Sequence, residues 1–242
     1  MNLQQLQEAV YVETNRPDLV PQTLQAVLAA TLALHGMELF FKDILTAQVV
    51  FDDGTQYLQT LDTTTMPFYR KICFFRKDDP STYQGYEVNG SPLPPLYTYA
   101  QGRVFGIQAA RSMIRWISPD NIFDSYKSEK VDVGYQAGST LMIKSSTPLK
   151  YGLVGWYAWP NCDIANSGAA FSSWIAQEFP YAIVYSAASA LLQKIGMTDA
   201  ARKYDSQPDP RNPMDRGGLV QQQISMLITN NIVLEEGSQD NE

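Results

Sequence analysis

The sequence predicts an α+β fold, in which helices from both ends of the chain form a bundle and a β-rich subdomain is inserted between them. Apolar residues recur at three- and four-residue spacing in 1–45 and again in 170–205. Over 46–169 the apolar period changes to two, and turn-forming residues separate the short runs. We expect this insert to be a sandwich or barrel-like subdomain. The remaining residues, 206–242, begin with closely spaced prolines and are expected to form an extended C-terminal arm.

Two N-terminal helices are expected in the first part of the chain. Asn2 is a suitable N-cap for the first, which the Arg16-Pro17-Asp18 sequence ends. The second is expected from Asp18 to Leu34, with Gly36 as its stop signal. The apolar residues that follow predict a short third helix within Met37–Leu45.

The segment Ser172–Tyr204 predicts a helical hairpin. Pro180 is tolerated in the first turn of a helix, and Gly196 provides a left-handed stop. Thr198 is then expected to cap a second, short helix that ends at Tyr204. We expect the N-terminal helices to cover the apolar face of the hairpin, and a neighbouring copy to complete that cover. The expected buried stripe consists of Ile183, Val184, Ala187, Ala190, Leu191 and Ile195.

The β-rich insert contains several predicted strands. Residues 47–58 alternate around an Asp52-Asp53-Gly54 turn and predict a hairpin. A further strand is expected over Tyr69–Lys77. Strands are also expected at 130–135, 140–143 and 151–157. The PLPPL sequence at 92–96 resembles an SH3 ligand, but a surface loop is the better interpretation in a compact domain.

The net charge, the cysteine count and the length of the apolar runs argue against several classes of protein. The chain has 242 residues and a formal net charge of −7, which argues against tight binding to a nucleic-acid backbone. Two cysteines, Cys73 and Cys162, are too few for a disulfide framework and are expected to be reduced thiols. No basic, apolar signal sequence opens the chain, and its longest apolar run is too short for a spanning helix. A soluble, intracellularly made protein is expected.

The sequence contains no recognisable catalytic or metal-binding motif. The single histidine, His35, ends an apolar helix and is expected to be a satisfied core or capping residue. Neither a phosphate-binding loop, a nucleophile elbow nor a Cys/His ligand cluster occurs. We therefore expect a protein that is not an enzyme and takes no cofactor or metal. The many Tyr and Trp residues of the insert fit an interaction surface and ordinary core packing equally well.

Five segments together resemble the head-to-tail adaptor (connector, or head-completion) proteins of short-tailed bacteriophages. They occur in the expected order along most of the chain. They are QTLQAVLAATLALHGM (22–37), ISPDNIFD (117–124), YGLVGWYAWP (151–160), SSWIAQEFPYAIVYSAASALLQKIGMTDAARKYD (172–205) and LVQQQISMLITNNI (219–232).

The resemblance implies a structural role in the virion, at the head–tail junction, after assembly in the host cytoplasm. Such adaptors form a ring, typically of twelve copies, that binds the portal, extends the DNA channel and receives the tail tube or nozzle. DNA passes through the channel without sequence-specific binding, and no membrane is involved. The proline-rich stretch 206–218 interrupts what the family usually has as continuous helix, so which part of 206–242 contacts the portal stays open. Interface residues expected from this comparison are Trp174, Tyr181, Tyr185, Arg211, Arg216, Leu219, Ile224 and Leu227.

Two other readings stay open on the sequence alone. The chain could be another phage tail component, such as a tail-tube or baseplate protein with a similar α+β plan. Less strongly supported is a cell-wall hydrolase, because adjacent carboxylate pairs such as Asp52-Asp53 and Glu235-Glu236 do not form a general acid/base pair.

Overall fold

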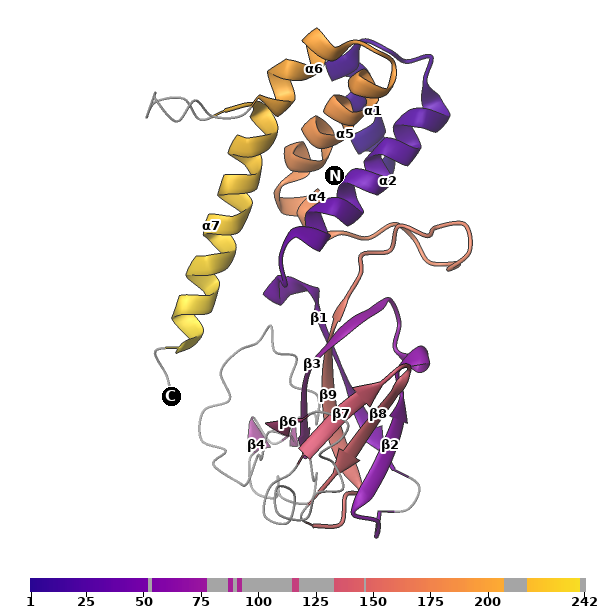
Figure 1. Cartoon of the computed structure of the whole chain (residues 1–242), viewed down its shortest axis with the longest axis vertical. Coiled ribbons are helices and arrows are strands. Elements are labelled where there is room, and N and C mark those ends of the chain that lie inside the picture. Colours follow the sequence, from indigo (N-terminus) through magenta and orange to yellow (C-terminus); the bar gives the residue numbers. More distant parts are fainter. Residues whose placement is uncertain are drawn as a thin grey trace. The chain divides into compact units, whose positions relative to one another are not determined.

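The α+β class is confirmed by the computed structural model of the chain. The structure describes residues 1–51, 54–77, 87–88, 91–92, 115–117, 133–145, 147–206 and 217–239. The chain divides into two compact units, which are coloured along the sequence in Figure 1. The helical unit comprises Met1–Asp43 and Trp159–Glu242, and the β unit comprises Ile44–Ala158.

The first N-terminal helix agrees with the prediction, whereas the second begins and ends a few residues later than predicted. α1 spans Leu3–Thr14, and Asn2 caps it as predicted: its side chain accepts from the Gln5 amide at 2.8 Å, and Gln5 reciprocates at 2.9 Å. α2 spans Val20–Met37. Gly36 therefore lies inside the last turn of α2 and does not stop it, because the chain becomes extended only at Glu38.

The predicted short helix over Met37–Leu45 is wrong. The structure has a single 3-10 turn, η1, at Phe41–Asp43, and strand β1 begins at Ile44. The apolar residues of this segment have a different use from the one expected. Phe40 is fully buried in the helical core. Ile44 and Leu45 belong to strand β1, which pairs with another strand of the sheet.

The C-terminal hairpin is present, with one additional helix before it. α4 (Trp174–Glu178), capped by Ser173, was not predicted because five residues give no recognisable apolar period. α5 begins at Pro180 as predicted, and Gly196 adopts φ +80 after its end. Thr198 is the first residue of the next helix and not its N-cap. The N-cap is Met197, whose side chain makes no capping hydrogen bond. The helices of this segment are α5 (Pro180–Lys194) and α6 (Thr198–Asp205).

Helices from both ends of the chain share one core. α5 packs against α1, α2, α4, α6 and α7 (Leu219–Gln239), and its buried side has two corrections to the predicted stripe. Ala190 is exposed and Ile195 is half-buried. Part of the expected C-terminal arm is also built into this unit, because Val220 and Leu227 of α7 belong to its core. Fully buried side chains of the core include Leu6, Val10, Val27, Phe40, Ile175, Ile183, Val184 and Ala187.

The β unit has two sheets whose side chains meet in one core. One sheet has the order β1-β9-β3, and the other has the order β2-β8-β7-β6. The core combines residues from both sheets, among them Phe75 and Trp156 with Leu141 and Ile143. The strands are β1 (Ile44–Val50), β2 (Leu58–Asp62), β3 (Tyr69–Lys77), β6 (Arg115–Trp116), β7 (Val133–Ala137), β8 (Thr140–Lys144) and β9 (Tyr151–Ala158); β4 (Glu87–Val88) and β5 (Ser91–Pro92) pair separately, and a 3-10 turn, η2, occupies Thr63–Thr65.

The predicted hairpin over 47–58 is wrong. β1 pairs with β9 and β2 pairs with β8, so the two strands lie in different sheets. In contrast, the strands predicted near 69–77, 140–143 and 151–157 are present. The residues Asp52 and Asp53, the PLPPL sequence after Pro92 and positions 118–124 of the ISPDNIFD segment lie outside the described residues.

Candidate functional site

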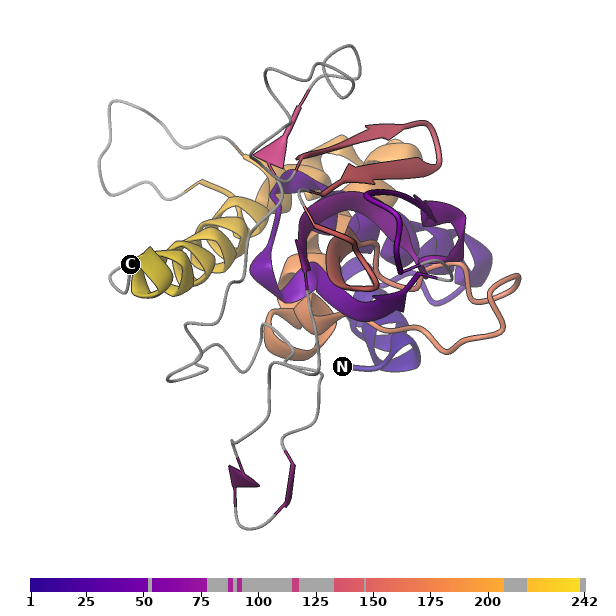
Figure 2. The same ribbon diagram turned by 90° about the horizontal axis from the view of Figure 1, so that it is seen from below.

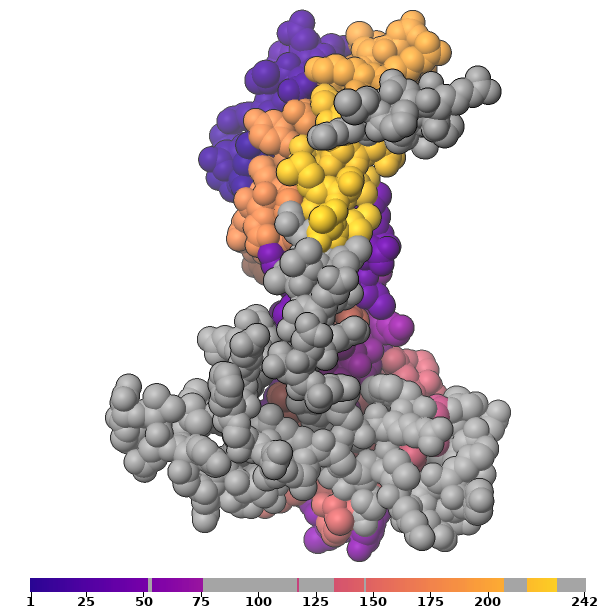
Figure 3. Space-filling model, turned by 90° about the vertical axis from the view of Figure 1, so that its left-hand side faces the viewer, coloured from indigo at the N-terminus to yellow at the C-terminus, as the bar shows by residue number. Residues whose placement is uncertain are grey.

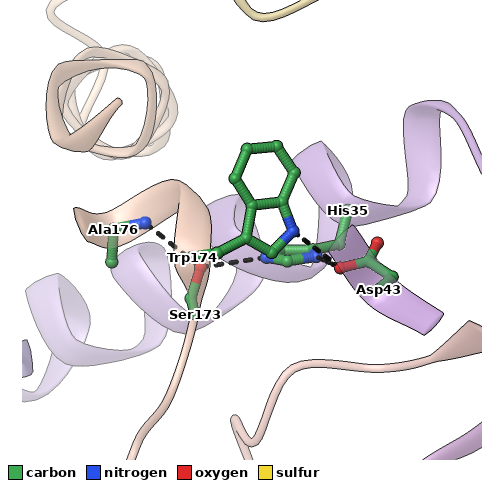
Figure 4. Close-up of polar contacts among 5 residues, drawn as sticks. All are labelled: His35, Asp43, Ser173, Trp174 and Ala176. Carbon is green, nitrogen blue, oxygen red and sulfur yellow. Dashed lines mark hydrogen bonds and ion pairs between the residues drawn. The ribbon is translucent and has the colours of Figure 1, made fainter. Parts of the chain in front are cut away.

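The most distinctive group of polar side chains lies in the helical unit (Figure 4). We call it the His35 cluster, and it consists of His35, Asp43, Ser173 and Trp174. His35 comes from the last turns of α2 and Asp43 from η1, whereas Ser173 and Trp174 open α4. Asp43 directly precedes β1, and Ser173 follows the return of the chain from β9. The cluster thus joins the two segments through which the chain leaves and re-enters the helical unit.

Hydrogen bonds connect these side chains in a row. His35 Nδ1 lies 2.8 Å from Asp43 Oδ1, and His35 Nε2 lies 2.9 Å from Ser173 Oγ. The Trp174 indole N–H donates to the same Asp43 oxygen at 2.8 Å, and the Ala176 amide donates to Ser173 Oγ at 3.2 Å. These contacts are drawn as dashed lines in Figure 4.

One tautomer of His35 satisfies both ring nitrogens and the Ser173 hydroxyl, whereas Asp43 Oδ2 is buried without a hydrogen-bond partner among the described residues. If Nδ1–H donates to the Asp43 carboxylate, Nε2 is an acceptor and the Ser173 hydroxyl donates to it. Ser173 Oγ then uses a lone pair for the Ala176 amide, which is the usual role of a serine N-cap. Each donor is used once, as buried polar groups require. The expectation that His35 is a satisfied core histidine is confirmed.

The row has the connectivity of a nucleophile, a base and an orienting carboxylate, but not the access that catalysis needs. His35 is 1% exposed and both Asp43 and Ser173 are 6% exposed. A catalytic serine must reach a substrate carbonyl, whereas this hydroxyl is turned inward between an imidazole and a backbone amide. The arrangement is therefore suited to fixing the positions of α2, η1 and the start of α4 relative to one another.

Aromatic rings surround the indole end of the cluster. Trp174 meets Phe40 and Phe179 edge-on, at centroid separations of 5.4 and 6.4 Å. The Lys42 ammonium lies 5.0 Å from the Trp174 ring centroid and pairs with Glu178 at 2.5 Å. Trp174, expected at an interface, is thus half-buried and makes these contacts inside the helical unit.

A second aromatic row runs along α5. Tyr181 is 43% exposed and its ring lies 5.4 Å from that of Tyr185, which in turn lies 5.7 Å from that of Tyr204. The buried Tyr204 hydroxyl donates to the Glu13 carboxylate at 2.8 Å. Burial, followed by this carboxylate, raises the pKa of Tyr204 above its ordinary range. The row ties the end of α1 to α6 and leaves Tyr181 at the surface.

The other expected interface residues have different positions. Leu227 is 1% exposed and belongs to the core of the helical unit. Leu219 and Ile224 are half-buried against that core. Arg211 and Arg216 lie outside the described residues.

A metal site and a membrane-spanning helix are both absent from the part of the chain that the structure describes. No group of three or more His, Cys, Asp or Glu residues there has the geometry to hold a metal ion. Within the same residues, every helix is too short or too polar to cross a bilayer. Cys73 and Cys162 do not form a disulfide, and burial raises the pKa of Cys162 to about 11.

Two comparisons with known proteins gave no relative. A scan against protein-family models found no match, and a search of curated proteins found none of significant similarity.

Proposed function

We propose that the protein is a non-enzymatic head-to-tail adaptor of a tailed bacteriophage, which assembles as a ring between the portal and the tail. The observation that carries this proposal is the ordered set of five segments that resemble short-tailed-phage adaptors, from residue 22 to residue 232. The acidic balance of the chain, a formal net charge of −7, supports a conduit that does not retain the DNA passing through it.

The division of the chain supports the same role. Both ends of the chain contribute helices to one unit, and the insert forms a second unit with its own core. A ring subunit needs separate surfaces for its neighbours, for the portal and for the tail, and two independently packed units provide them. The protein would then be a component of the virion at the head–tail junction.

Co-assembly with the portal tests the proposal. Purified chain is mixed with the portal protein encoded nearest to its gene and analysed by sedimentation and electron microscopy. We expect a ring of this chain on one end of the portal. If the chain and the portal stay separate at every concentration tested, that result would contradict the adaptor role.

One observation favours a second class, an acyl-transfer hydrolase: the Ser173–His35–Asp43 row. If the row is catalytic, a fluorophosphonate probe labels Ser173 in the native protein, and Ser173→Ala abolishes the label. We favour the adaptor because Ser173 Oγ is buried and caps α4. The expected result is no labelling of native protein.

A further inference from the structure

α7 is attached to the helical unit along one apolar stripe. Val220 and Leu227 are buried in the core of this unit, and Ile224, between them on the same side of the helix, packs against it half-buried. The helix contacts α5 and α6. Figures 1 and 2 show it at the edge of the helical unit, and Figure 3 shows it along the surface, in yellow. The helical unit therefore contains a site that is complementary to α7.

The start of α7 lies directly against the end of α6. The Gly218 amide donates to the Ser206 carbonyl at 2.7 Å, and a Cβ on Gly218 would clash with the Tyr204 carbonyl oxygen. Gly217 precedes it with φ +70, a conformation that favours glycine. Two glycines thus allow the backbone to approach this closely. Ser206 and Gly218 are hydrogen-bonded neighbours, which a tight turn would be long enough to join.

The connection between α6 and α7 is longer than this arrangement needs. Its ten residues, 207–216, lie outside the described residues and include Pro208, Pro210 and Pro213. A proline-rich composition favours an extended chain, so a connection of this length can span about 30 Å. A linker returns a segment to its own site most effectively when its length matches the span, and a longer, stiffer linker does so less effectively. The same length lets α7 reach the α7 site of a neighbouring copy.

We propose that α7 exchanges between copies, so that in the assembled ring α7 of one copy occupies the α7 site of the next. The site fits a second copy because every copy carries the identical stripe of Val220, Ile224 and Leu227, and an exchanged helix makes the same buried contacts. Exchange of an identical element is a low-cost route to association, and exchange in one direction from copy to copy closes into a ring when the rotation allows it. The inference rests on the ring assembly proposed above and names the element that links its subunits.

Chemical cross-linking distinguishes a helix kept by its own copy from an exchanged one. Cys73 and Cys162 are changed to Ser, and new cysteines are placed at the exposed Ser206 and at Gln221, about one helical turn beyond Gly218. A short bis-maleimide is added to dilute protein, to protein refolded from urea at high concentration, and to protein assembled on the portal. We expect links within single chains in the dilute sample and links between chains in the other two, read from the masses of the denatured products.

A shortened connection is the matched control. Deletion of 208–215 keeps enough chain to join Ser206 to Gly218 but too little to reach a second copy. The deletion variant, with the same two cysteines, should keep the thermal midpoint of the parent, form links only within its own chain, and self-associate about tenfold more weakly or less. A Gly/Ser sequence of the original length keeps the reach, and this second variant should still give links between chains.

The outcomes separate the exchange from the adaptor role. A ring on the portal with links only within single chains would overturn the exchange and leave the adaptor role standing. Links between chains in the concentrated protein, without any portal complex, would support the exchange and contradict the adaptor role. The exchange is also overturned if the deletion variant associates as strongly as the parent, or if the parent gives only links within single chains in every sample.

Discussion

At the scale of single residues, we expect the His35 cluster to contribute most to the stability of the helical unit, because it is buried and connects segments far apart in the sequence. The bond between His35 and Ser173 spans 138 positions along the chain. Net hydrogen bonds stabilise a fold by only about 1 kcal/mol, but an unpaired buried group costs about 1–3 kcal/mol. Removing the central imidazole should therefore cost more than removing a surface charge.

His35→Ala tests this expectation. The change deletes two hydrogen bonds, leaves Asp43 and Ser173 without that partner, and opens a cavity beside Trp174. We expect a loss of about 2–5 kcal/mol in the free energy of unfolding, measured by urea denaturation. Lys42→Ala is the matched control, since its pair with Glu178 is partly exposed and should contribute about 1 kcal/mol or less. Equal losses in the two variants would contradict the central role of His35.

A pH dependence is expected from Tyr204. Its phenol donates to Glu13, and burial with this carboxylate raises its pKa from the ordinary value of 10.0. The contribution is fully present below about pH 9, where the phenol is neutral in both the folded and the unfolded state. As pH rises further, the unfolded chain loses the proton before the folded protein does, so stability falls.

Tyr204→Phe isolates this effect. The variant should lose about 1–3 kcal/mol near neutral pH, because the Glu13 carboxylate loses a buried donor. Between about pH 9 and pH 11 the gap from the parent protein should narrow, since phenylalanine does not titrate. Denaturation curves across that range check both points, and a gap that stays constant would contradict the assigned pKa shift.

At the scale of elements, local chemistry determines where the helices begin and end. The capping box of Asn2 and Gln5 starts α1, and the left-handed Gly196 follows α5. The Asn2 cap and the Gly196 stop were predicted from the sequence because each signal lies within a few residues of the boundary, whereas the reciprocal bond from Gln5 was not predicted.

Gly196→Ala should destabilise the helical unit by about 1 kcal/mol, through backbone conformation alone. A Cβ at this position meets no atom within 4 Å, and φ is +80, so no steric contact with other side chains confuses the result. Asn15→Gly is the control, because Asn15 has φ 53 and glycine adopts this conformation readily. Thermal unfolding should give a lower midpoint for Gly196→Ala than for Asn15→Gly. An unchanged midpoint for Gly196→Ala would contradict the expected strain and show that the turn relaxes.

Pairing of distant elements could not be predicted in this way. β1 and β2 lie close in sequence and show the alternation of a hairpin, yet β9 pairs with β1 and β8 with β2. In β9, Gly152 and Gly155 leave space for the rings of Phe75 and Phe74, a fit that only the assembled sheet reveals. The His35 cluster was missed for the same reason: its members come from three elements, and one of them, α4, was not predicted.

At the scale of the whole molecule, the proposed adaptor role depends on surfaces between copies and toward the portal. Several residues expected at interfaces are used inside the subunit, Leu227 and Trp174 most clearly, whereas Tyr181 stays exposed. Periodicity identifies apolar residues but cannot separate a face covered by the same chain from one covered by a neighbour. Burial in the folded chain identifies the residues that the chain itself covers, such as Leu227, and separates them from an exposed residue such as Tyr181.

The most direct measurement is electron microscopy of the purified chain mixed with the portal protein encoded nearest to its gene. The adaptor proposal predicts a closed ring of this chain seated on one end of the portal. Portal particles without added density, together with chain that sediments alone at every ratio tested, would contradict it.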